Sequence, residues 1–246
     1  MLKLEDVDIF YGRAQVGFKL SLTVNEGDFL GLFGRNGSSK SSLFRAVMGL
    51  KPPQVKGRIL FKDRDITGLP PHEIANLGIG WVPEDRKIFP NLTIRRNLQL
   101  GEKSARFLPK GQKLFGLEDA FRVFPKLSDM RNKLGSQMSG GEQQMLTVAR
   151  TMMGNPSLLL LDEPTEGLAP NIAADVLKMI LEIREQYNVT TIVVEQFSDE
   201  LLKHLNRCCV MEMGECIFDG APQVLLNDEK LKHKLIGIGG SLEEES

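Results

Sequence analysis

The chain has few cysteines, almost no net charge and no long apolar run, and each scarcity excludes a class of protein. Its three cysteines, Cys208, Cys209 and Cys216, are too few and too close together for a disulfide framework, and they form no CxxC pair. The 31 basic and 32 acidic residues give a formal net charge of −1, so no overall basic field favours nucleic acid or an anionic membrane. The longest aliphatic stretch, Leu158 to Leu161, is far shorter than the roughly 20 residues of a membrane span.

Glycine and proline are also modest in number, and histidine is rare. The 24 Gly and 12 Pro among 246 residues are well below the roughly 25–30% of low-complexity chains, which excludes global disorder. With 41% hydrophobic residues, a chain of this length buries roughly 70–75% of its unfolded surface and needs no metal for stability. The histidines, His72, His204 and His233, are scattered in polar stretches, so we assign no metal-binding cluster.

Two kinds of strand pattern divide the sequence. Alternating apolar and polar residues in the first thirty positions predict two half-buried antiparallel strands. Runs that are apolar on both faces begin at Asp28 and recur at 79–82, 158–161 and 191–194, each followed by a loop and a helical pattern. Strands that alternate with helices in this way are typical of an α/β fold with a parallel, doubly wound sheet.

The segment between Pro83 and Pro156 has no comparable buried strand. Its polar, helix-favouring sequence predicts a mostly helical subdomain inserted into the core. We therefore expect a core with a β-subdomain at 1–83 and 156–220, a helical subdomain at 84–155, and a helical tail at 221–246 with a frayed acidic end. A stripe at helical spacing predicts core packing along one helix. It consists of Val176, Met179, Ile180, Ile183 and Tyr187.

The segment GRNGSSKSS, from Gly34 to Ser42, lies between a predicted strand and a predicted helix. A phosphate-binding loop surrounds an anion with backbone N–H groups and a helix N-terminus, and adds a lysine for the phosphates and a hydroxyl for Mg²⁺. The residues in those positions are Gly34, Gly37, Lys40 and Ser41. Ser39 occupies the place of the glycine before the lysine, so the segment alone fits a polar strand-to-helix turn about equally well.

A second element, LLLLDEP from Leu158 to Pro164, decides between these alternatives. It predicts a buried strand whose carboxyl end presents Asp162 and Glu163, at the edge where open α/β sheets bind ligands. Asp162 can hold Mg²⁺ and Glu163 can polarise an attacking water. A lone acidic pair would fit a solvated turn, but the pair together with the upstream loop indicates a nucleotide site.

Between these elements lies MSGGEQQ, from Met138 to Gln144, which resembles the signature motif of the ATP-binding cassette (ABC) ATPases. In that family the Ser-Gly-Gly at a helix N-terminus contacts the γ-phosphate held by the opposite subunit. Exposed N–H groups at a helix start suit such an anion. As an isolated turn the motif would indicate only a helix cap, but its place between the two other motifs extends the resemblance over nearly the whole chain.

Other positions can be compared with the family one by one. Tyr11 matches the aromatic residue that stacks on adenine, although a simple strand-end tyrosine is the alternative. Glu84 stands where the family usually has a Mg²⁺-contacting glutamine, Gln196 where it has a switch histidine, and Ala169 where it has an aspartate. These three variants resemble the second of the two paired ATP-binding subunits of branched-chain amino-acid uptake systems and of related urea or amide systems.

The resemblance implies a P-loop ATPase of the ABC type that binds ATP and Mg²⁺. It implies catalytic roles for Glu163 and Gln196. The implied ATP-binding residues are Tyr11, Gly34, Arg35, Asn36, Gly37, Ser38, Ser39, Lys40, Ser41, Ser42 and Glu84. The implied signature residues, which act on the nucleotide of the opposite subunit, are Ser139, Gly140, Gly141 and Glu142. The implied Mg²⁺ ligands are Ser41, Asp162 and Glu84.

The resemblance also implies partners and a place in the cell. We expect a head-to-tail dimer with a paralogue or a second copy, a membrane permease, and indirectly an extracytoplasmic solute-binding protein, but no nucleic acid. The N-terminus mixes charged and apolar residues, unlike a secretory signal, so we expect the cytoplasmic face of the inner membrane.

The expected function is ATP-driven import of branched-chain or other amino acids. The alternatives are import of urea or amides, and a hydrolysis-impaired subunit that supports an active paralogue, because of Ser39. A DNA-repair ABC protein would carry sustained heptads between Lys40 and Ser139, and these are missing. A translation factor of this family would need two cassettes in one chain.

Overall fold

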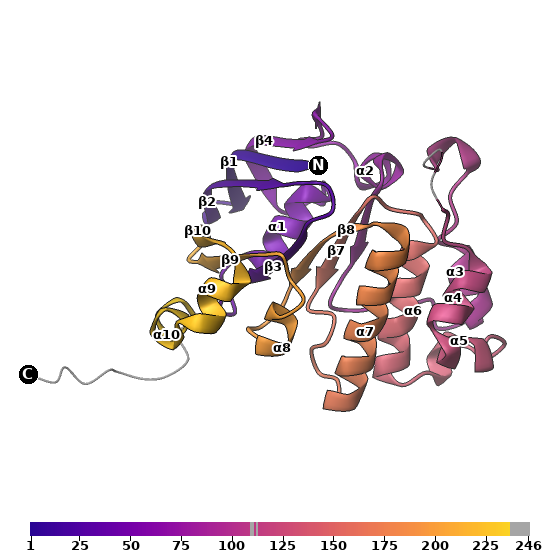
Figure 1. The fold of residues 1–246 in the computed structure, drawn as a ribbon. Helices are drawn as coiled ribbons and strands as arrows, with labels where there is room; N and C mark the ends of the chain where they lie inside the picture. The colour runs from indigo at the N-terminus through magenta and orange to yellow at the C-terminus, as the bar shows by residue number, and fades with distance from the viewer. Residues whose placement is uncertain (109–110, 112, 237–246) are drawn as a thin grey trace, which may run out of the picture.

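The computed structural model describes residues 1–108, 111 and 113–236, and these form two sheets with helices packed against them (Figure 1). The first sheet is antiparallel and has the strand order β2-β1-β4-β5. Its strands are β1 (Leu2–Tyr11), β2 (Ala14–Val24), β4 (Gln54–Phe61) and β5 (Arg64–Asp65). Since β1 and β2 pair antiparallel, the prediction from the alternating pattern is confirmed.

The second sheet forms the centre of the molecule and has the order β10-β9-β3-β8-β7-β6. Its strands are β3 (Phe29–Phe33), β6 (Ile79–Val82), β7 (Leu158–Asp162), β8 (Thr190–Val194), β9 (Arg207–Glu212) and β10 (Glu215–Gly220). All neighbouring pairs are parallel except β9 and β10. Every residue of β3, β7 and β8 is buried, as the runs that are apolar on both faces predict.

Helices cover this central sheet. The α-helices are α1 (Lys40–Val47), α2 (Pro71–Leu77), α3 (Ile94–Gln99), α4 (Leu117–Val123), α5 (Pro125–Asp129), α6 (Gly140–Met152), α7 (Pro170–Tyr187), α8 (Asp199–Leu202), α9 (Pro222–Asn227) and α10 (Glu229–Ile236). Two short 3₁₀ helices are η1 (Ala105–Phe107) and η2 (Gly135–Gln137). Helices α3, α4 and α5 gather beside α6 at one end of the molecule (Figure 1), and the division into a core and an inserted helical subdomain stays a prediction. The predicted acidic end falls on residues 237–246, outside the described residues.

The core consists of two apolar clusters separated by the central sheet. Phe29 and Phe33 of β3 belong to one cluster, and the intervening Leu30 and Leu32 belong to the other, as the two-residue period of a strand requires. Cys208 and Cys209 divide between the clusters in the same way. The predicted stripe on α7 packs as core. Its buried members are Val176, Ile180 and Ile183, with Met179 and Tyr187 partly buried against the same cluster.

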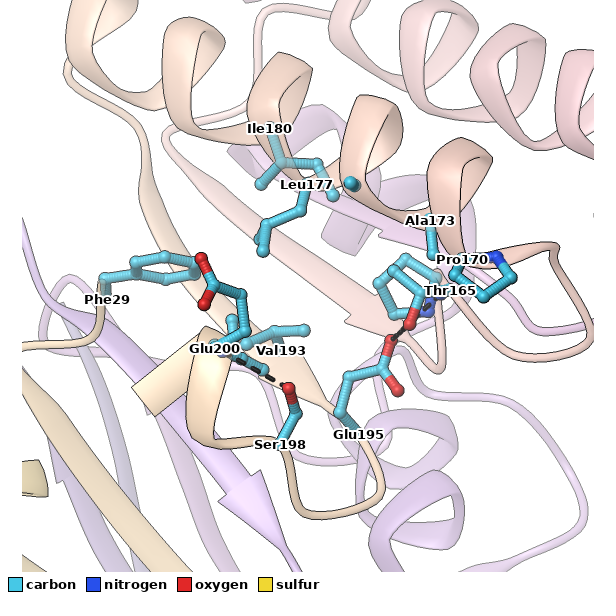
Figure 2. A pocket seen from close by; sticks show the side chains of 13 residues that line it. Phe29, Thr165, Pro170, Ala173, Leu177, Ile180, Val193, Glu195, Ser198 and Glu200 are labelled. Carbon is cyan, nitrogen blue, oxygen red and sulfur yellow. Dashed lines mark hydrogen bonds between the residues drawn. The ribbon is translucent and has the colours of Figure 1, made fainter. Parts of the chain in front are cut away.

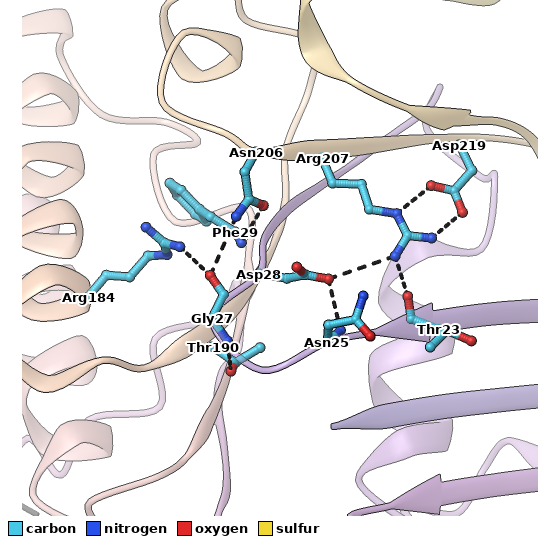
Figure 3. A network of polar contacts seen from close by, with 10 residues as sticks. All are labelled: Thr23, Asn25, Gly27, Asp28, Phe29, Arg184, Thr190, Asn206, Arg207 and Asp219. Atoms are coloured by element: carbon cyan, nitrogen blue, oxygen red, sulfur yellow. Dashed lines mark hydrogen bonds and ion pairs between the residues drawn. The ribbon is translucent and has the colours of Figure 1, made fainter.

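A polar network fixes the amino ends of the central strands (Figure 3). Arg207, at the start of β9, pairs with Asp219 of β10. Gly27, in the turn before β3, accepts a hydrogen bond from Arg184 of α7 at 2.5 Å and donates one to Thr190 Oγ1 of β8 at 3.0 Å. These contacts thus hold the amino ends of the strands together. The carboxyl ends of the parallel strands lie side by side at the other end of the sheet.

Candidate functional site

The loop between β3 and α1 turns tightly and depends on glycine. Gly34 has a φ of +152°, and a Cβ there would lie 2.3 Å from the carbonyl oxygen of Met211. Gly37 has a φ of +84° in open space, so conformation and not crowding favours glycine. Arg35 and Asn36 between them are exposed, whereas the hydroxyl of Ser38 is buried without a hydrogen-bond partner in the described chain. The loop therefore offers polar groups that its own fold leaves unsatisfied.

Lys40, the first residue of α1, is folded back over this loop. Its Nζ donates to the carbonyl oxygens of Gly34 at 2.8 Å and Arg35 at 3.1 Å. Burial lowers the pKa of the ammonium, and the nearby carboxylates of Asp162, Glu166 and Glu195 oppose that shift. A buried cation held only by carbonyl dipoles is well placed to exchange them for the charged oxygens of a phosphate.

Ser39 has a left-handed backbone, with φ +73° and ψ +17°. A residue with a β-carbon there costs roughly 1–3 kcal/mol. Its side chain does not cap α1 but donates a hydrogen bond to the carbonyl of Val16, in β2, at 2.5 Å. The serine that replaces the usual glycine is therefore held in a backbone conformation that favours glycine. The effect of this conformation on the nucleotide stays a prediction.

Ser41 and Asp162 form the centre of the candidate cation site. Ser41 Oγ donates to Asp162 Oδ1 at 2.9 Å. Asp162 is 3% exposed, and burial raises its pKa to about 6, assisted by the charge of Glu84 and opposed by the bond from Ser41 and by Lys40. A buried carboxylate, a hydroxyl and an exposed Glu84 nearby form a set of oxygen donors that fits Mg²⁺, since a divalent cation would offset the unfavourable burial of negative charge.

Glu163 follows directly and lines the same open polar pocket of ≈ 260 Å³ as the phosphate loop and Glu84. Its φ is +46°, and its N–H donates to the carbonyl of Val194, in β8, at 2.9 Å. A non-glycine residue adopts this left-handed conformation only when the surrounding structure holds it there. Such strained residues are common at functional sites. Gln196, two residues beyond β8, is exposed.

Tyr11 reaches the loop from the other sheet. It is the last residue of β1, and its hydroxyl oxygen lies 3.3 Å from Ser42 Oγ. The fold thus brings the aromatic ring to the phosphate loop, and stacking on adenine stays a prediction.

The signature residues form the start of α6 and a separate surface. Ser139 Oγ accepts a hydrogen bond from the N–H of Glu142 at 3.4 Å, and Glu142 Oε2 accepts one from the N–H of Ser139 at 2.8 Å. This reciprocal pair is a capping box. A Cβ on Gly141 would lie 2.4 Å from Ile172 Cγ2, which favours glycine there, whereas a Cβ on Gly140 would lie 2.6 Å from Arg86 Nη1, the end of a flexible side chain that can move aside.

The structure therefore brings the predicted phosphate-binding and hydrolytic residues together, but the signature residues lie elsewhere on the chain. The phosphate loop, Glu84 and Glu163 share a pocket. The signature residues line a different pocket of ≈ 250 Å³, together with Gly167, Leu168 and Ala169. Within one chain, the signature turn does not contribute to the pocket of the phosphate loop.

Three residues at these surfaces were not anticipated from the sequence. Glu166 lines the phosphate-loop pocket, Arg86 contacts the signature turn and donates to the carbonyl of Glu166 at 3.4 Å, and Glu195 is a buried carboxylate next to Gln196. Each lies within three positions in sequence of a residue that the motifs did identify, namely Glu163, Glu84 and Gln196 respectively. An ionisable residue within an otherwise apolar strand end, as in VVEQF, was the signal available for Glu195.

The family model of the ABC transporters matches residues 18–166. The chain belongs to this family. It is an ABC ATPase, which binds nucleotide and hydrolyses ATP, and the fold class expected from the sequence is confirmed.

Relatives match this ABC ATPase over nearly its whole length. The high-affinity branched-chain amino acid transport ATP-binding protein BraG of Pseudomonas aeruginosa is 34% identical over 237 residues, which cover 96% of this chain and 100% of the relative. The lipopolysaccharide export system ATP-binding protein LptB of Haemophilus influenzae is 32% identical, covering 96% and 97%.

Solved structures show the same architecture. A nucleotide-free ATP-binding cassette from an ABC transporter superposes with a TM-score of 0.77 at 28% identity, covering 98% of this chain and 99% of that one. The ADP conformation of such a cassette gives the same values. Within the described residues, none of the helices has the length and apolar character needed to span a membrane.

Proposed function

We propose that this ABC ATPase powers the import of branched-chain or other amino acids through a membrane permease. The observation that carries the proposal is the full-length similarity to BraG, supported by 29% identity to a probable branched-chain amino acid transport protein, LivF of Archaeoglobus fulgidus. The similarity to LptB, which is named for export, is nearly as high. The direction of transport therefore needs its own experiment.

The proposed phosphate site uses the loop before α1. Lys40 would release the carbonyls of Gly34 and Arg35 and bind phosphate oxygens, while the N–H groups at the start of α1 add their dipoles. Ser41 and Asp162, with Glu84 beside them, would hold Mg²⁺. When bound, this ion neutralises charge on the phosphates.

The proposed hydrolytic step uses the carboxyl ends of β7 and β8. Glu163 lines the pocket, so its carboxylate can accept a hydrogen bond, and then a proton, from the attacking water. The side-chain amide of Gln196 would donate a hydrogen bond to the γ-phosphate. Because an amide does not titrate as histidine does, Gln196 orients the phosphate without acting as a pH-tuned switch.

The proposed assembly is a head-to-tail dimer with a paralogue or a second copy. The support is the separation of the signature turn from the phosphate-loop pocket of the same chain. In such a dimer, Ser139, Gly140, Gly141 and Glu142 would present the start of α6 to the γ-phosphate bound by the other subunit. Each nucleotide site is then complete only when two subunits meet.

The proposed permease contact is a groove beside the loop that follows Glu84. The groove has a volume of ≈ 430 Å³ and is lined by residues that include Trp81, Phe89 and Leu100. Phe89 and Leu100 are 48% and 55% exposed, so a partner segment would bury apolar surface here. Docking there would hold the chain on the cytoplasmic face of the membrane and link it indirectly to an extracytoplasmic solute-binding protein.

A second candidate function rests on Ser39. Ser39 has left-handed backbone angles and directly precedes Lys40, the lysine of the phosphate loop. A subunit with impaired hydrolysis could then bind nucleotide in support of an active paralogue. Import of urea or amides is the alternative for the transported solute.

The test is reconstitution of the chain with the membrane proteins that copurify with it. Proteoliposomes with the solute-binding protein and labelled leucine, glutamate or urea outside are supplied with ATP inside. ATP-dependent uptake of an amino acid supports the proposal. Uptake of urea alone, or ATP-driven release of solute or lipid, would contradict it.

A further inference from the structure

The carboxylate of Glu195 is buried beside the proposed hydrolytic residues, and none of the proposed steps uses it. Glu195 is 8% exposed and lies between the end of β8 and Gln196. Its Oε1 accepts two hydrogen bonds from Thr165, one from the backbone N–H at 2.9 Å and one from Oγ1 at 2.7 Å (Figure 2). One oxygen therefore accepts from both hydrogen-bond donors of a single residue.

Thr165 belongs to the turn that begins at Glu163. The N–H of Glu166 donates to the carbonyl of Glu163 at 3.2 Å and closes this turn. The N–H of Glu163 itself donates to the carbonyl of Val194 at 2.9 Å. Val194 and Glu195, at the end of β8, thus form hydrogen bonds with Glu163 and Thr165 of the turn. These bonds fix the turn against the segment that leads into Gln196.

The side of the turn that faces α7 and α8 is not closely packed. A cavity of ≈ 200 Å³ lies between α7, α8 and the central sheet, and its lining includes Pro164, Thr165, Leu177, Val193 and Leu201. Figure 2 shows Glu195 and Thr165 facing each other at one end of this cavity, opposite Phe29. Because an open pocket supplies few van der Waals contacts, hydrogen bonds hold Thr165 in place: two to Glu195, and one that its carbonyl accepts from the N–H of Leu168 at 3.3 Å.

The cost of burying this carboxylate argues against a role in packing alone. Glu195 makes no ion pair with any residue that the structure describes. Burial raises its pKa, and the hydrogen bonds from Thr165 lower it. A buried carboxylate that has hydrogen-bond donors but no ion pair stabilises less than an apolar side chain of similar volume would.

We propose that Glu195 is a positioning residue for ATP hydrolysis, which acts through Thr165 to set Glu163 against Gln196. This inference rests on the proposed roles of Glu163 and Gln196. The groups proposed to bind phosphate, Lys40 and Ser41, belong to another element, α1. Loss of the bond between Glu195 and Thr165 therefore slows the hydrolytic step. ATP affinity stays unchanged where the carboxylate of Glu195 is kept near Lys40, as in Thr165→Val.

The experiment measures kcat, the KM for MgATP and the ATP Kd in the active assembly. Thr165→Val removes the hydroxyl and keeps the shape, and Glu195→Ala removes the acceptor. Each is expected to lower kcat about tenfold, because the lost bonds involve a charged acceptor. KM and Kd should be unchanged in Thr165→Val, which keeps the carboxylate of Glu195 near Lys40. Thr165→Ser restores the hydroxyl and should restore kcat. The double variant should be no slower than Glu195→Ala alone.

Thr190→Val is the matched control at the other end of β8. It also removes a buried threonine hydroxyl, which accepts a hydrogen bond from Gly27, and it should lower Tm while leaving kcat unchanged. Wild-type kcat in Glu195→Ala, additive losses in the double variant, or an equal loss of kcat in Thr190→Val would each overturn the inference. Normal turnover in Glu163→Gln would instead refute the proposed function, so the two failures are distinguishable.

Discussion

The hydroxyl of Ser41 donates a hydrogen bond to the carboxylate of Asp162, with 2.9 Å between Oγ and Oδ1, across 121 positions of sequence. This bond joins the start of α1 to the end of β7. Both residues were predicted as Mg²⁺ ligands from separate motifs. The bond between them means that the two oxygen donors are already side by side before a cation binds.

Asp162→Asn is expected to stabilise the nucleotide-free protein at neutral pH while removing Mg²⁺-dependent hydrolysis. The folded-state pKa of Asp162 is raised from 3.8 to about 6 by burial, so the folded form binds the proton more tightly than the unfolded form. The free energy of unfolding of the wild type therefore falls as pH rises from about 4 to 6, by about 3 kcal/mol at most. The Asn side chain does not ionise, so the variant avoids this loss.

Urea unfolding without nucleotide at pH 4.5 and pH 7.5 measures the effect. The stability advantage of the Asn variant should be larger at pH 7.5. An advantage of equal size at both pH values, or a less stable variant at pH 7.5, would show that the burial of charge at Asp162 is not the cause.

Ser39→Gly is expected to bind MgATP more tightly or to turn it over faster than the wild type. The substitution removes a β-carbon from a residue with φ +73°, where glycine is free of strain. It also removes the hydrogen bond to Val16. Ser39→Ala is the control, because it loses the same bond but keeps the β-carbon. Equal affinity and turnover in wild type and Ser39→Gly would exclude an effect of the β-carbon.

Much of the fold could be predicted because it depends on local patterns. Burial on both faces identified β3, β7 and β8, and the helical spacing of apolar residues identified the packed face of α7. The phosphate loop and the acidic pair after β7 meet because the carboxyl ends of parallel strands share one edge.

The contacts that could not be predicted join elements far apart in sequence. Periodicity does not indicate that Ser39 bonds to β2, that Arg86 lies against Gly140, or that Glu195 holds Thr165. Each depends on the detailed path of a loop and on which side chain fills the space beside it. The positive φ at Glu163 arises in the same way, from a turn bonded to a neighbouring strand.

Gly141→Ala is expected to lower the free energy of unfolding by about 1–3 kcal/mol, the usual cost of overpacking. Its new Cβ would lie 2.4 Å from Ile172 Cγ2. Adding Ile172→Ala removes that clash and should recover part of the lost stability. Chemical denaturation of the single and double variants measures this. If Ile172→Ala lowers the free energy of unfolding by the same amount in the Gly141→Ala variant as in the wild type, the clash with Ile172 is not the cause of the lost stability.

The most direct test of the proposed hydrolytic site is Glu163→Gln, which keeps the size of the side chain and removes the base. ATP binding and ATP turnover are measured on the same preparation. We expect an ATP Kd close to that of the wild type and turnover reduced by about 10² or more, the usual contribution of a general base. Turnover at the wild-type rate would contradict the assignment of Glu163 and of the site built around it.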